Sequence, residues 1–377
     1  MKFAHLSDLH LGKYLNQYSL MEDQEYILKQ IIQRIREQDV DVVLVSGDIY
    51  DRAVPPGEAV ALFDDFLSEL AEDQRKVCII SGNHDSPERI AFASRLIAAS
   101  GVYLSPVYQG EIQPVRLEDS YGPVNIYMLP FIKPVHVRHF FPEEEIHSYT
   151  DAVRSAITHM NVDGRERNVL LAHQFVTGAS RSDSEDISVG GLDNVDADVF
   201  DHFDYVALGH LHRAQNVENN RIRYCGTPLK YSFSECKDEK TVTIVELGNK
   251  EDILVDTVPL VPLRDMIELE GEFREMVSAP FYENVDTEAF IRLTLTDERE
   301  VLDAFSRLRS IYPNLMAMDY KKRAVQKDQE AGGTRERTSL HPADLFGQFY
   351  QEMNRQPLWE AQQQYLLEKI EKIWGGA

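Results

Sequence analysis

The sequence predicts an α/β fold, with helices packed on β-sheet, followed by a small α+β domain and C-terminal helices. Two observations support this prediction. Short runs rich in β-branched residues alternate with stretches of helical spacing over roughly the first 250 residues, which is typical of α/β folds. After Pro259 and Pro262 the pattern changes to a shorter alternation of about 60 residues, near the lower limit of domain size.

The individual elements follow from the spacing of apolar residues. Six short apolar runs are predicted as strands, at residues 2–6, 40–45, 77–80, 124–129, 169–172 and 205–208. Between the earlier runs, apolar residues recur every three or four positions, which predicts amphipathic helices. The three helical stretches are marked by Ile27, Ile31 and Ile35, by Leu62, Phe66 and Leu70, and by Ile90, Ala93 and Ile97.

Four segments result from these elements. Residues 1–258 are predicted to form the main domain, and residues 259–320 a small α+β domain. Residues 321–340 carry a Gly-Gly pair and very few apolar residues, which indicates a linker. Residues 341–377 hold two amphipathic stretches separated by Pro357, which predicts two C-terminal helices.

Composition excludes several classes of protein. The 377 residues include 39 Lys and Arg against 63 Asp and Glu, and the net charge of −24 excludes a general basic surface for gripping nucleic acid. Any such contact must use a local basic patch or bound cations. Three cysteines cannot build a disulfide framework, and this usage is typical of a reducing cytosol. No apolar run of about 18 residues and no signal peptide is visible, so we expect a cytoplasmic protein that does not span a membrane.

Polar side chains of ligand type follow the predicted strands directly. Five segments contribute them: Asp8-Leu9-His10, Gly47-Asp48 with Asp51, Gly82-Asn83-His84-Asp85, His173, and Gly209-His210-Leu211-His212. Because each segment follows an apolar strand, we expect all of them at the carboxyl edge of one sheet, where open α/β sheets bind ligands. Residues two apart in extended chain point the same way, so Asp8 can converge with His10, and His210 with His212.

The chemistry of these residues favours a pair of divalent metal ions. Carboxylates, imidazoles and one amide, without cysteine, suit Mn²⁺, Fe²⁺ or Zn²⁺. Seven candidates are too many for one tetrahedral ion, but two ions about 3.5–4 Å apart that share a bridging carboxylate would use them all. Such a pair activates water and neutralises charge on a phosphate ester, so no nucleophilic side chain is required. The seven are Asp8, His10, Asp48, Asn83, His173, His210 and His212.

The order of these motifs resembles that of a known superfamily. D-x-H, G-D-x-x-D, G-N-H-D, a lone His and G-H-x-H follow one another as in the calcineurin-like metallophosphoesterases. Over essentially the whole chain, the surrounding sequence is similar to the SbcD family of bacterial nuclease subunits, most clearly in MKFAHLSDLHLGK, GDIYDRAVPP, SGNHDSPER, ALGHLHRAQ and YCGTPLKYSFSE. The resemblance implies a metallophosphoesterase sandwich, in which helices flank central β-sheets, with a small α+β capping domain and C-terminal helices.

The resemblance also implies a role for each site residue. His84 matches the family's catalytic histidine, which stabilises the phosphate or protonates the leaving oxygen and holds no metal. The resemblance implies two metal ions, which are expected to be manganese. Each ion would have its own set of ligands, and one carboxylate would be shared by both ions. These are Asp8, His10 and His212 for one ion, Asn83, His173 and His210 for the other, and Asp48 as the bridge.

Four further residues beside the motifs are candidates for supporting roles. Asp85 follows His84 and can orient its imidazole in catalysis. Asp51 stands where archaeal and eukaryotic relatives carry a second histidine, so its catalytic role is open. Both aspartates can instead cap helices or turns. Arg52 and Arg89 follow metal motifs and are candidates for contacts with substrate phosphates.

Together these features predict a Mn²⁺-dependent DNA nuclease. The resemblance implies a 3′→5′ exonuclease on double-stranded DNA and an endonuclease on single-stranded and hairpin DNA, working with an SbcC-type ATPase in DNA end processing, repair and recombination. No G-x-x-x-x-G-K-[ST] loop is present, so the partner would hydrolyse ATP. The alternatives are a metallophosphatase or nucleotide phosphodiesterase, and a non-catalytic scaffold for DNA ends.

Two protein interfaces are implied by the resemblance. Helices within residues 57–99 would form a homodimer, although their spacing alone favours packing on the sheet. The amphipathic helices of residues 341–377 would hold the ATPase partner, although they can also fold back on the body. The basic linker can be a solvated tether or a contact for DNA.

Overall fold

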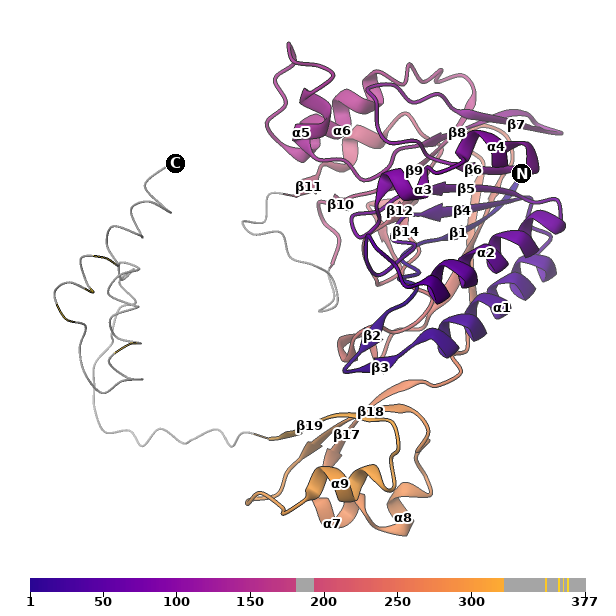
Figure 1. Ribbon diagram of the computed structural model, residues 1–377. Coiled ribbons are helices and arrows are strands. Elements are labelled where there is room, and N and C mark those ends of the chain that lie inside the picture. Colours follow the sequence, from indigo (N-terminus) through magenta and orange to yellow (C-terminus); the bar gives the residue numbers. More distant parts are fainter. Residues whose placement is uncertain (181–192, 322–349, 351–358, 360–361, 363–364, 366–377) are drawn as a thin grey trace. The chain divides into compact units, whose positions relative to one another are not determined.

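The structure is a computed structural model that describes residues 1–180 and 193–321, together with four single positions, Tyr350, Trp359, Gln362 and Tyr365 (Figure 1). Residues 1–321 form one structural unit. Apart from those four positions, the predicted C-terminal helices lie outside the described residues, and so does the predicted linker beyond Lys321.

The first of two large sheets contains the N-terminal strand. Its members are β1 (Lys2–Leu6), β4 (Val42–Ser46), β5 (Lys76–Ile80), β6 (Val102–Leu104), β15 (Thr241–Leu247) and β16 (Ile253–Pro259). They lie in the order β16-β15-β1-β4-β5-β6. The strands β1, β4, β5 and β6 run parallel to one another. On the other side of β1, β15 pairs with it antiparallel, and β16 pairs antiparallel with β15.

The second large sheet is built from the middle of the chain. Its members are β7 (Val115–Asp119), β8 (Gly122–Met128), β9 (Arg167–His173), β12 (Tyr205–Gly209), β13 (Gln215–Val217) and β14 (Asn219–Tyr224). They lie in the order β13-β14-β12-β9-β8-β7. The four central strands are parallel, and β7 and β13 are antiparallel edges.

The central strands are apolar on both faces because each sheet is covered on both sides. In β4, Val43 and Val45 belong to the core shared with the helices, whereas Val42 and Leu44 belong to the core between the two sheets. A strand buried on both faces forms a continuous apolar run in the sequence. The six predicted strands are therefore all found, with ends that differ by at most a few residues.

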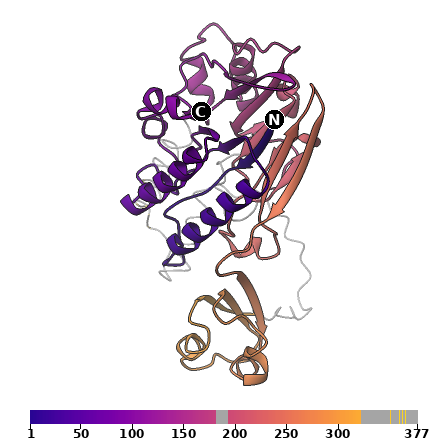
Figure 2. The same ribbon diagram turned by 90° about the vertical axis from the view of Figure 1, so that its right-hand side faces the viewer.

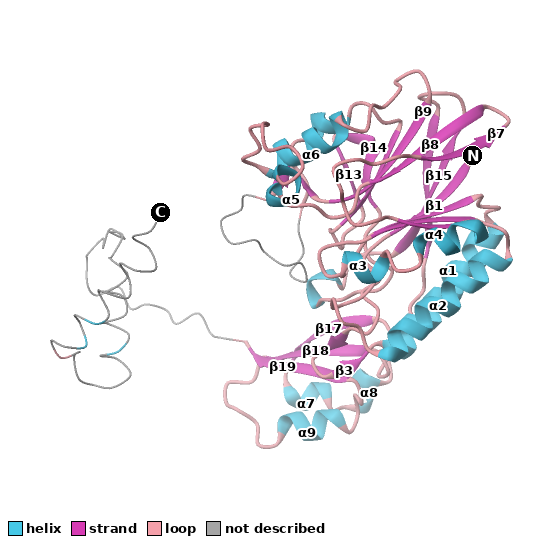
Figure 3. Cartoon of the chain, turned by 45° about the horizontal axis from the view of Figure 1, so that its top comes forward, coloured by secondary structure: helices cyan, strands magenta, loops and turns pink. Residues whose placement is uncertain are grey.

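Helices cover the outer face of each sheet. Against the first sheet, α1 (Met21–Glu37) and α2 (Gly57–Glu72) run side by side (Figure 2). Against the second sheet pack α5 (Pro134–Arg138) and α6 (Tyr149–Thr158). The four layers follow one another as helix, sheet, sheet and helix, as seen in Figure 3.

The third predicted helix is interrupted. Two short helices, α3 (Pro87–Ile90) and α4 (Ser94–Ile97), take its place, because Ala93 between them has a left-handed φ of 58°. Phe92 and Leu96 in this segment are each 79% exposed. The prediction of one continuous helix is therefore wrong, but the packing expected from its spacing is found, because Ile90 and Ile97 lie against the core of the first sheet.

Smaller elements lie beside these layers. Short strand pairs are formed by β2 (Tyr14–Leu15) with β3 (Tyr18–Ser19), and by β10 (Phe175–Val176) with β11 (Asn194–Val195). Turns of 3-10 helix occur at Ala98–Ser100, Ala197–Phe200 and Phe233–Glu235.

After β16 the chain forms a small module with its own core. Its parallel strands β17 (Met266–Gly271), β18 (Phe290–Leu295) and β19 (Leu315–Tyr320) form one sheet. The connecting helices are α7 (Phe273–Met276), α8 (Ala279–Tyr282) and α9 (Ala304–Arg309). A separate apolar cluster of this module includes Ile291, Leu293 and Leu308.

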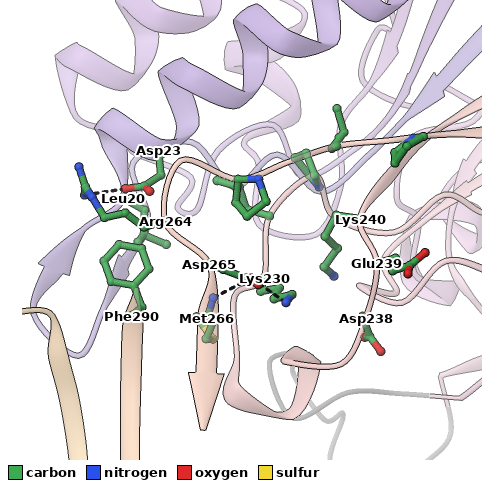
Figure 4. A pocket seen from close by; sticks show the side chains of 15 residues that line it. Leu20, Asp23, Lys230, Asp238, Glu239, Lys240, Arg264, Asp265, Met266 and Phe290 are labelled. Carbon is green, nitrogen blue, oxygen red and sulfur yellow. Dashed lines mark hydrogen bonds and ion pairs between the residues drawn. The ribbon is translucent and has the colours of Figure 1, made fainter. Parts of the chain in front are cut away.

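Polar side chains join this module to the main sheets. A cavity of about 270 Å³ lies at the junction, and Figure 4 shows the residues that line it. Arg264 reaches Asp23 at 3.0 Å, and Lys230 reaches Asp265 at 2.7 Å. Because these cations are already neutralised by carboxylates, this cavity is a poor candidate for binding phosphate.

Candidate metal centre and active site

The candidate ligands lie at the carboxyl ends of strands from both large sheets. The loops after β1, β4 and β5 belong to the first sheet, and the ends of β9 and β12 belong to the second. The expectation that one sheet edge carries all the motifs is therefore wrong, and the site lies where the two sheets meet. The first sheet contributes Asp8, His10, Asp48 and Asn83, and the second contributes His173, His210 and His212.

The backbone at several of these residues has an unfavourable conformation. φ is 52° at Asp8, 45° at His10, 50° at Asp48 and 98° at His210. Positive φ is uncommon for residues other than glycine, and such residues cluster at functional sites. Hydrogen bonds between the loops hold these turns: the Asp8 N–H donates to the Gly47 carbonyl and the His10 N–H to the Asp48 carbonyl, both at 3.0 Å.

Glycines allow the loops to approach one another closely. A Cβ atom at Gly82 would collide with the carboxylate of Asp48. A Cβ atom at Gly209, in the second sheet, would collide with the carbonyl of Ser46, in the first. A side chain at Gly82 would therefore displace the Asp48 carboxylate, and one at Gly209 would push the two sheets apart.

Asp48 lies between two groups of histidines. Its Oδ2 is 3.3 Å from Nε2 of His173 and 3.8 Å from Nε2 of His10. Its Oδ1 accepts the backbone N–H of His84 at 2.9 Å. The residue is 2% exposed, so its carboxylate is held in place by the surrounding protein. A carboxylate that bridges two ions requires such a position.

The first group consists of Asp8, His10 and His212. Their ligand atoms all lie within 4.8 Å of one another, and all three residues are buried. The Nε2 atoms of His10 and His212 face each other at 3.2 Å. Asp8 also accepts the backbone N–H of His210 on both carboxylate oxygens, each at 3.1 Å, which joins the first sheet to the second.

The second group consists of Asn83, His173 and His210. The Asn83 Oδ1 lies 3.0 Å from Nε2 of His173 and 3.0 Å from Nδ1 of His210. On the other side of the His173 ring, Nδ1 donates to the Ser46 carbonyl at 2.8 Å. This hydrogen bond orients the ring so that Nε2 points toward Asn83 and Asp48, as outer hydrogen bonds do for metal-binding histidines.

These two groups fit divalent metal ions. Imidazole nitrogens that face each other beside buried carboxylates are arranged to share a cation. Burial raises the pKa of Asp8 to about 6, although the facing His173 lowers it, and burial holds the pKa of His10 well below its usual value. The surrounding protein thus compensates the negative charge of the Asp8 carboxylate poorly. A bound divalent cation would compensate this charge. Oxygen and nitrogen ligands without sulfur suit Mn²⁺, Fe²⁺ or Zn²⁺.

His84 lies at the open side of this centre. Its Nδ1 donates to the backbone carbonyl of Asp51 at 3.2 Å. Its Nε2 is 4.0 Å from Oδ2 of Asp48, and its side chain is 26% exposed, whereas that of Asp48 is buried. An imidazole held in this way can reach a substrate bound over the two groups.

Comparisons with known proteins show the family of this chain. Residues 1–214 match the family model described as calcineurin-like phosphoesterase, and residues 262–354 match the one described as Type 5 capsule protein repressor C-terminal domain. A Staphylococcus epidermidis protein, named as the SbcD component of the nuclease SbcCD, is 32% identical over 322 residues, covering 84% of this chain and 85% of that protein. The chain belongs to the SbcD family of calcineurin-like phosphoesterases.

Another SbcD relative, from Staphylococcus saprophyticus, is 34% identical over 322 residues, which cover 84% of each chain. Among solved structures, a dimetal phosphatase from Danio rerio has a TM-score of 0.41 and 12% identity, over 70% of this chain and 98% of that chain. Family membership confirms the metallophosphoesterase fold and makes the chain a metal-dependent phosphoesterase. In the part of the chain that the structure describes, no helix is long and apolar enough to cross a membrane.

Asp51 supports this SbcD-family site from two sides. Its backbone carbonyl accepts the hydrogen bond from His84. Its side-chain Oδ1 accepts a 2.6 Å hydrogen bond from Lys13 and lies 3.7 Å from Nδ1 of His10. Lys13 was missed by sequence reasoning, because a lone lysine three residues after a metal motif has no recognisable signature.

Asp85 has partners other than the expected imidazole. Its Oδ2 accepts the backbone N–H groups of Gly82 and Ile49, at 2.9 and 3.1 Å, and its Oδ1 accepts that of Tyr50 at 3.0 Å. The carboxylate thus ties the loop after β5 to the loop after β4. The His84 ring itself is held by the Asp51 carbonyl, so Asp85 acts on the site by fixing the loop that carries His84.

A buried ionic network behind His212 was also missed from the sequence. Glu235 is fully buried, with Oε1 3.7 Å from Nδ1 of His212 and Oε2 2.6 Å from Nζ of Lys240. Lys240 also donates to the His212 carbonyl at 3.0 Å and to Oγ1 of Thr227 at 2.8 Å. Burial raises the pKa of Glu235, but the bonds with His212 and Lys240 hold it at about 2, so the group is a carboxylate.

The two predicted phosphate-contacting arginines lie at the surface. The Arg52 side chain is 74% exposed, and its Nε lies 3.8 Å from Oδ2 of Asp51. Arg89 is exposed on α3, the short helix that follows the G-N-H-D motif. Arg52 thus lies beside Asp51, whereas no contact joins Arg89 to the candidate ligands among the described residues.

Proposed function

We propose that this chain is the nuclease subunit of a DNA-processing complex. It would hydrolyse phosphodiesters with Mn²⁺, as a 3′→5′ exonuclease on double-stranded DNA and an endonuclease on single-stranded and hairpin DNA. One observation carries the proposal: seven ligand-type residues from two sheets come together, with the buried carboxylate of Asp48 between the other six. The two staphylococcal relatives are named as nuclease subunits, which supports a nucleic acid as the substrate.

Each residue has a role in this proposal. The two ions, when bound, supply activated water and neutralise charge on the phosphate. His84 hydrogen-bonds the phosphate or protonates the leaving oxygen, which is worth about 10²–10⁴-fold in rate. Asp51 and Asp85 position His84 through the contacts described above, and Arg52 and Arg89 contact neighbouring phosphates. The ions would be held by Asp8, His10 and His212 on one side and by Asn83, His173 and His210 on the other, with Asp48 shared by both groups.

The proposal includes a division of the chain. Residues 1–258 carry the chemistry, residues 259–320 form a capping domain, residues 321–340 a linker, and residues 341–377 the helices that bind an SbcC-type ATPase. A homodimer would form through residues 57–99, where the apolar side chains of Phe92 and Leu96 are exposed. The complex would act on DNA ends in the cytoplasm, in repair and recombination.

A cleavage assay tests the proposal. The purified chain is incubated with a labelled DNA duplex, a hairpin and p-nitrophenyl phosphate, with Mn²⁺, Mg²⁺ or a chelator. We expect Mn²⁺-dependent shortening of the duplex from its 3′ ends and cleavage of the hairpin, both far faster than hydrolysis of the monoester. Rapid monoester hydrolysis without DNA cleavage would instead favour a metallophosphatase.

The partner is tested separately. The chain is co-expressed with the ATPase encoded beside it or elsewhere in its genome, and the complex is isolated by size-exclusion chromatography. We expect co-elution, with ATP-dependent cleavage of duplexes whose ends are blocked. Separate elution of two folded proteins would contradict the proposed complex.

A further inference from the structure

A cavity of about 390 Å³ opens beside the second ligand group. Asn83 and His210 form part of its wall, and Phe131, Tyr149 and Phe175 give it aromatic surface. Its size lies within the range of about 300–1,000 Å³ that is typical of small-ligand sites. A neighbouring, more apolar cavity of about 480 Å³ shares Phe131 as a wall.

The aromatic surface reaches the metal centre itself. The ring of Phe131 meets the ring of His173 edge-on, with centroids 6.2 Å apart. Lys133, which also lines the cavity, holds its Nζ 6.0 Å from the centroid of the Phe131 ring. Aromatic rings combined with cations are typical of sites for unpaired nucleotides, because bases stack on the rings and phosphates meet the cations.

Gln174 provides an independent observation. It lines the same cavity, is 1% exposed, and donates from Nε2 to the Ile132 carbonyl at 3.1 Å. Its Oε1 is buried and accepts no hydrogen bond from any residue that the structure describes. A buried acceptor without a donor is unfavourable. A ligand with an N–H group, such as a base amine, could satisfy it after a small shift of the amide.

We propose that this cavity receives the base of the nucleotide at the scissile phosphate. The inference rests on the proposed nuclease function and adds that the cleaved strand enters the site unpaired at this position. Both faces of a base inside a duplex are covered by its neighbours, so a base that stacks on Phe131 or Phe175 must first leave the duplex, as in enzymes that flip their target base. Phe131 and Phe175 would stack on the base, Gln174 would accept its N–H, and Lys133 would contact the adjoining phosphate.

Abasic scanning tests this inference. Single-stranded oligonucleotides carry one tetrahydrofuran abasic site at successive positions, and cleavage by the purified full chain with Mn²⁺ is mapped on sequencing gels. Because stacking of one base contributes about 5- to 150-fold, we expect cleavage at the abasic nucleotide to fall by roughly tenfold. Cleavage at positions several nucleotides away should not change.

Variants connect the effect to the cavity. Phe131→Ala should raise KM for intact oligonucleotides and remove the discrimination against the abasic site. Its Mn²⁺ content, measured by elemental analysis, should stay normal. Phe175→Ala gives a second measurement if the first variant folds poorly. Tyr121→Ala is the matched control, because this aromatic residue is 56% exposed and lies between β7 and β8, and it should behave like the unchanged protein.

The possible outcomes distinguish a failure of the proposed base cavity from a failure of the proposed nuclease function. Equal cleavage at abasic and normal nucleotides by the unchanged protein would overturn the base cavity and leave the nuclease function standing. The base cavity would also be overturned if the Phe131→Ala variant still discriminated fully between abasic and normal nucleotides. If no oligonucleotide is cleaved with Mn²⁺, the proposed function itself is wrong.

Discussion

Replacing Glu235 by Gln tests the buried network behind His212. The Glu235 carboxylate lies 2.6 Å from the Lys240 ammonium and 3.7 Å from Nδ1 of His212, and all three side chains are buried. The substitution leaves the ammonium without its counter-charge, and removing one partner of a buried pair costs about 3–5 kcal/mol of unfolding free energy. Losing a carboxylate behind a metal-binding histidine costs about 10- to 100-fold in metal affinity.

Two measurements separate these effects. Urea denaturation of the metal-free protein gives the unfolding free energy, and titration calorimetry with Mn²⁺ gives the affinity. In the double variant Glu235→Gln/Lys240→Met the unpaired charge is gone, so we expect most of the unfolding free energy to return while the affinity stays low. Glu283→Gln, at an exposed position, is the control and should change neither quantity. Normal Mn²⁺ affinity in folded Glu235→Gln protein would refute the role of this carboxylate in orienting His212.

Four other substitutions or deletions address the remaining parts of the proposal. Asp48→Asn removes the charge shared by both ligand groups, so Mn²⁺ content and DNA cleavage should fall together, and normal content would speak against a bridge. His84→Gln should lose about 10²–10⁴-fold in cleavage rate while metal content and thermal midpoint stay unchanged; a parallel loss of metal would make His84 a ligand. Leu96→Asp should convert the dimer to a monomer in light scattering, whereas Leu254→Asp, at another exposed apolar position on β16, should not. Deletion from Ser339 onward should keep the fold and Mn²⁺-dependent cleavage of single-stranded DNA but abolish co-elution with the ATPase, and a deleted protein that still binds the ATPase would place the interface elsewhere.

The sequence revealed the candidate ligands because their motifs are short and follow buried strands. Asp8 with His10, and His210 with His212, are local patterns that depend on the chain alone. The division into two sheets was not visible, because apolar runs such as 77–80 and 169–172 are the same kind of sequence whichever sheet they join. Strand pairing is decided by contacts between segments far apart in the chain, so the single-edge expectation failed.

The supporting residues were missed for the same physical reason. Glu235 and Lys240 are ordinary charged residues in the sequence, and their importance follows only from burial beside His212. Lys13 gains its role from Asp51, which lies on another loop. The break at Ala93 likewise depends on a backbone conformation that apolar spacing does not encode.

The hydrogen bonds between His210 and Asp8 join residues 202 positions apart in the chain. Contacts of such separation form late in folding, because a long loop must close before they contribute. In addition, β1 pairs with β15, whose residues 241–247 are made still later. During synthesis, the emerging polypeptide therefore carries Asp8, His10, Asp48 and Asn83 without their partners from the second sheet. On the proposed assignment, an unfinished chain has no complete metal centre, and it would not cleave DNA until His212 has emerged and the two sheets have docked.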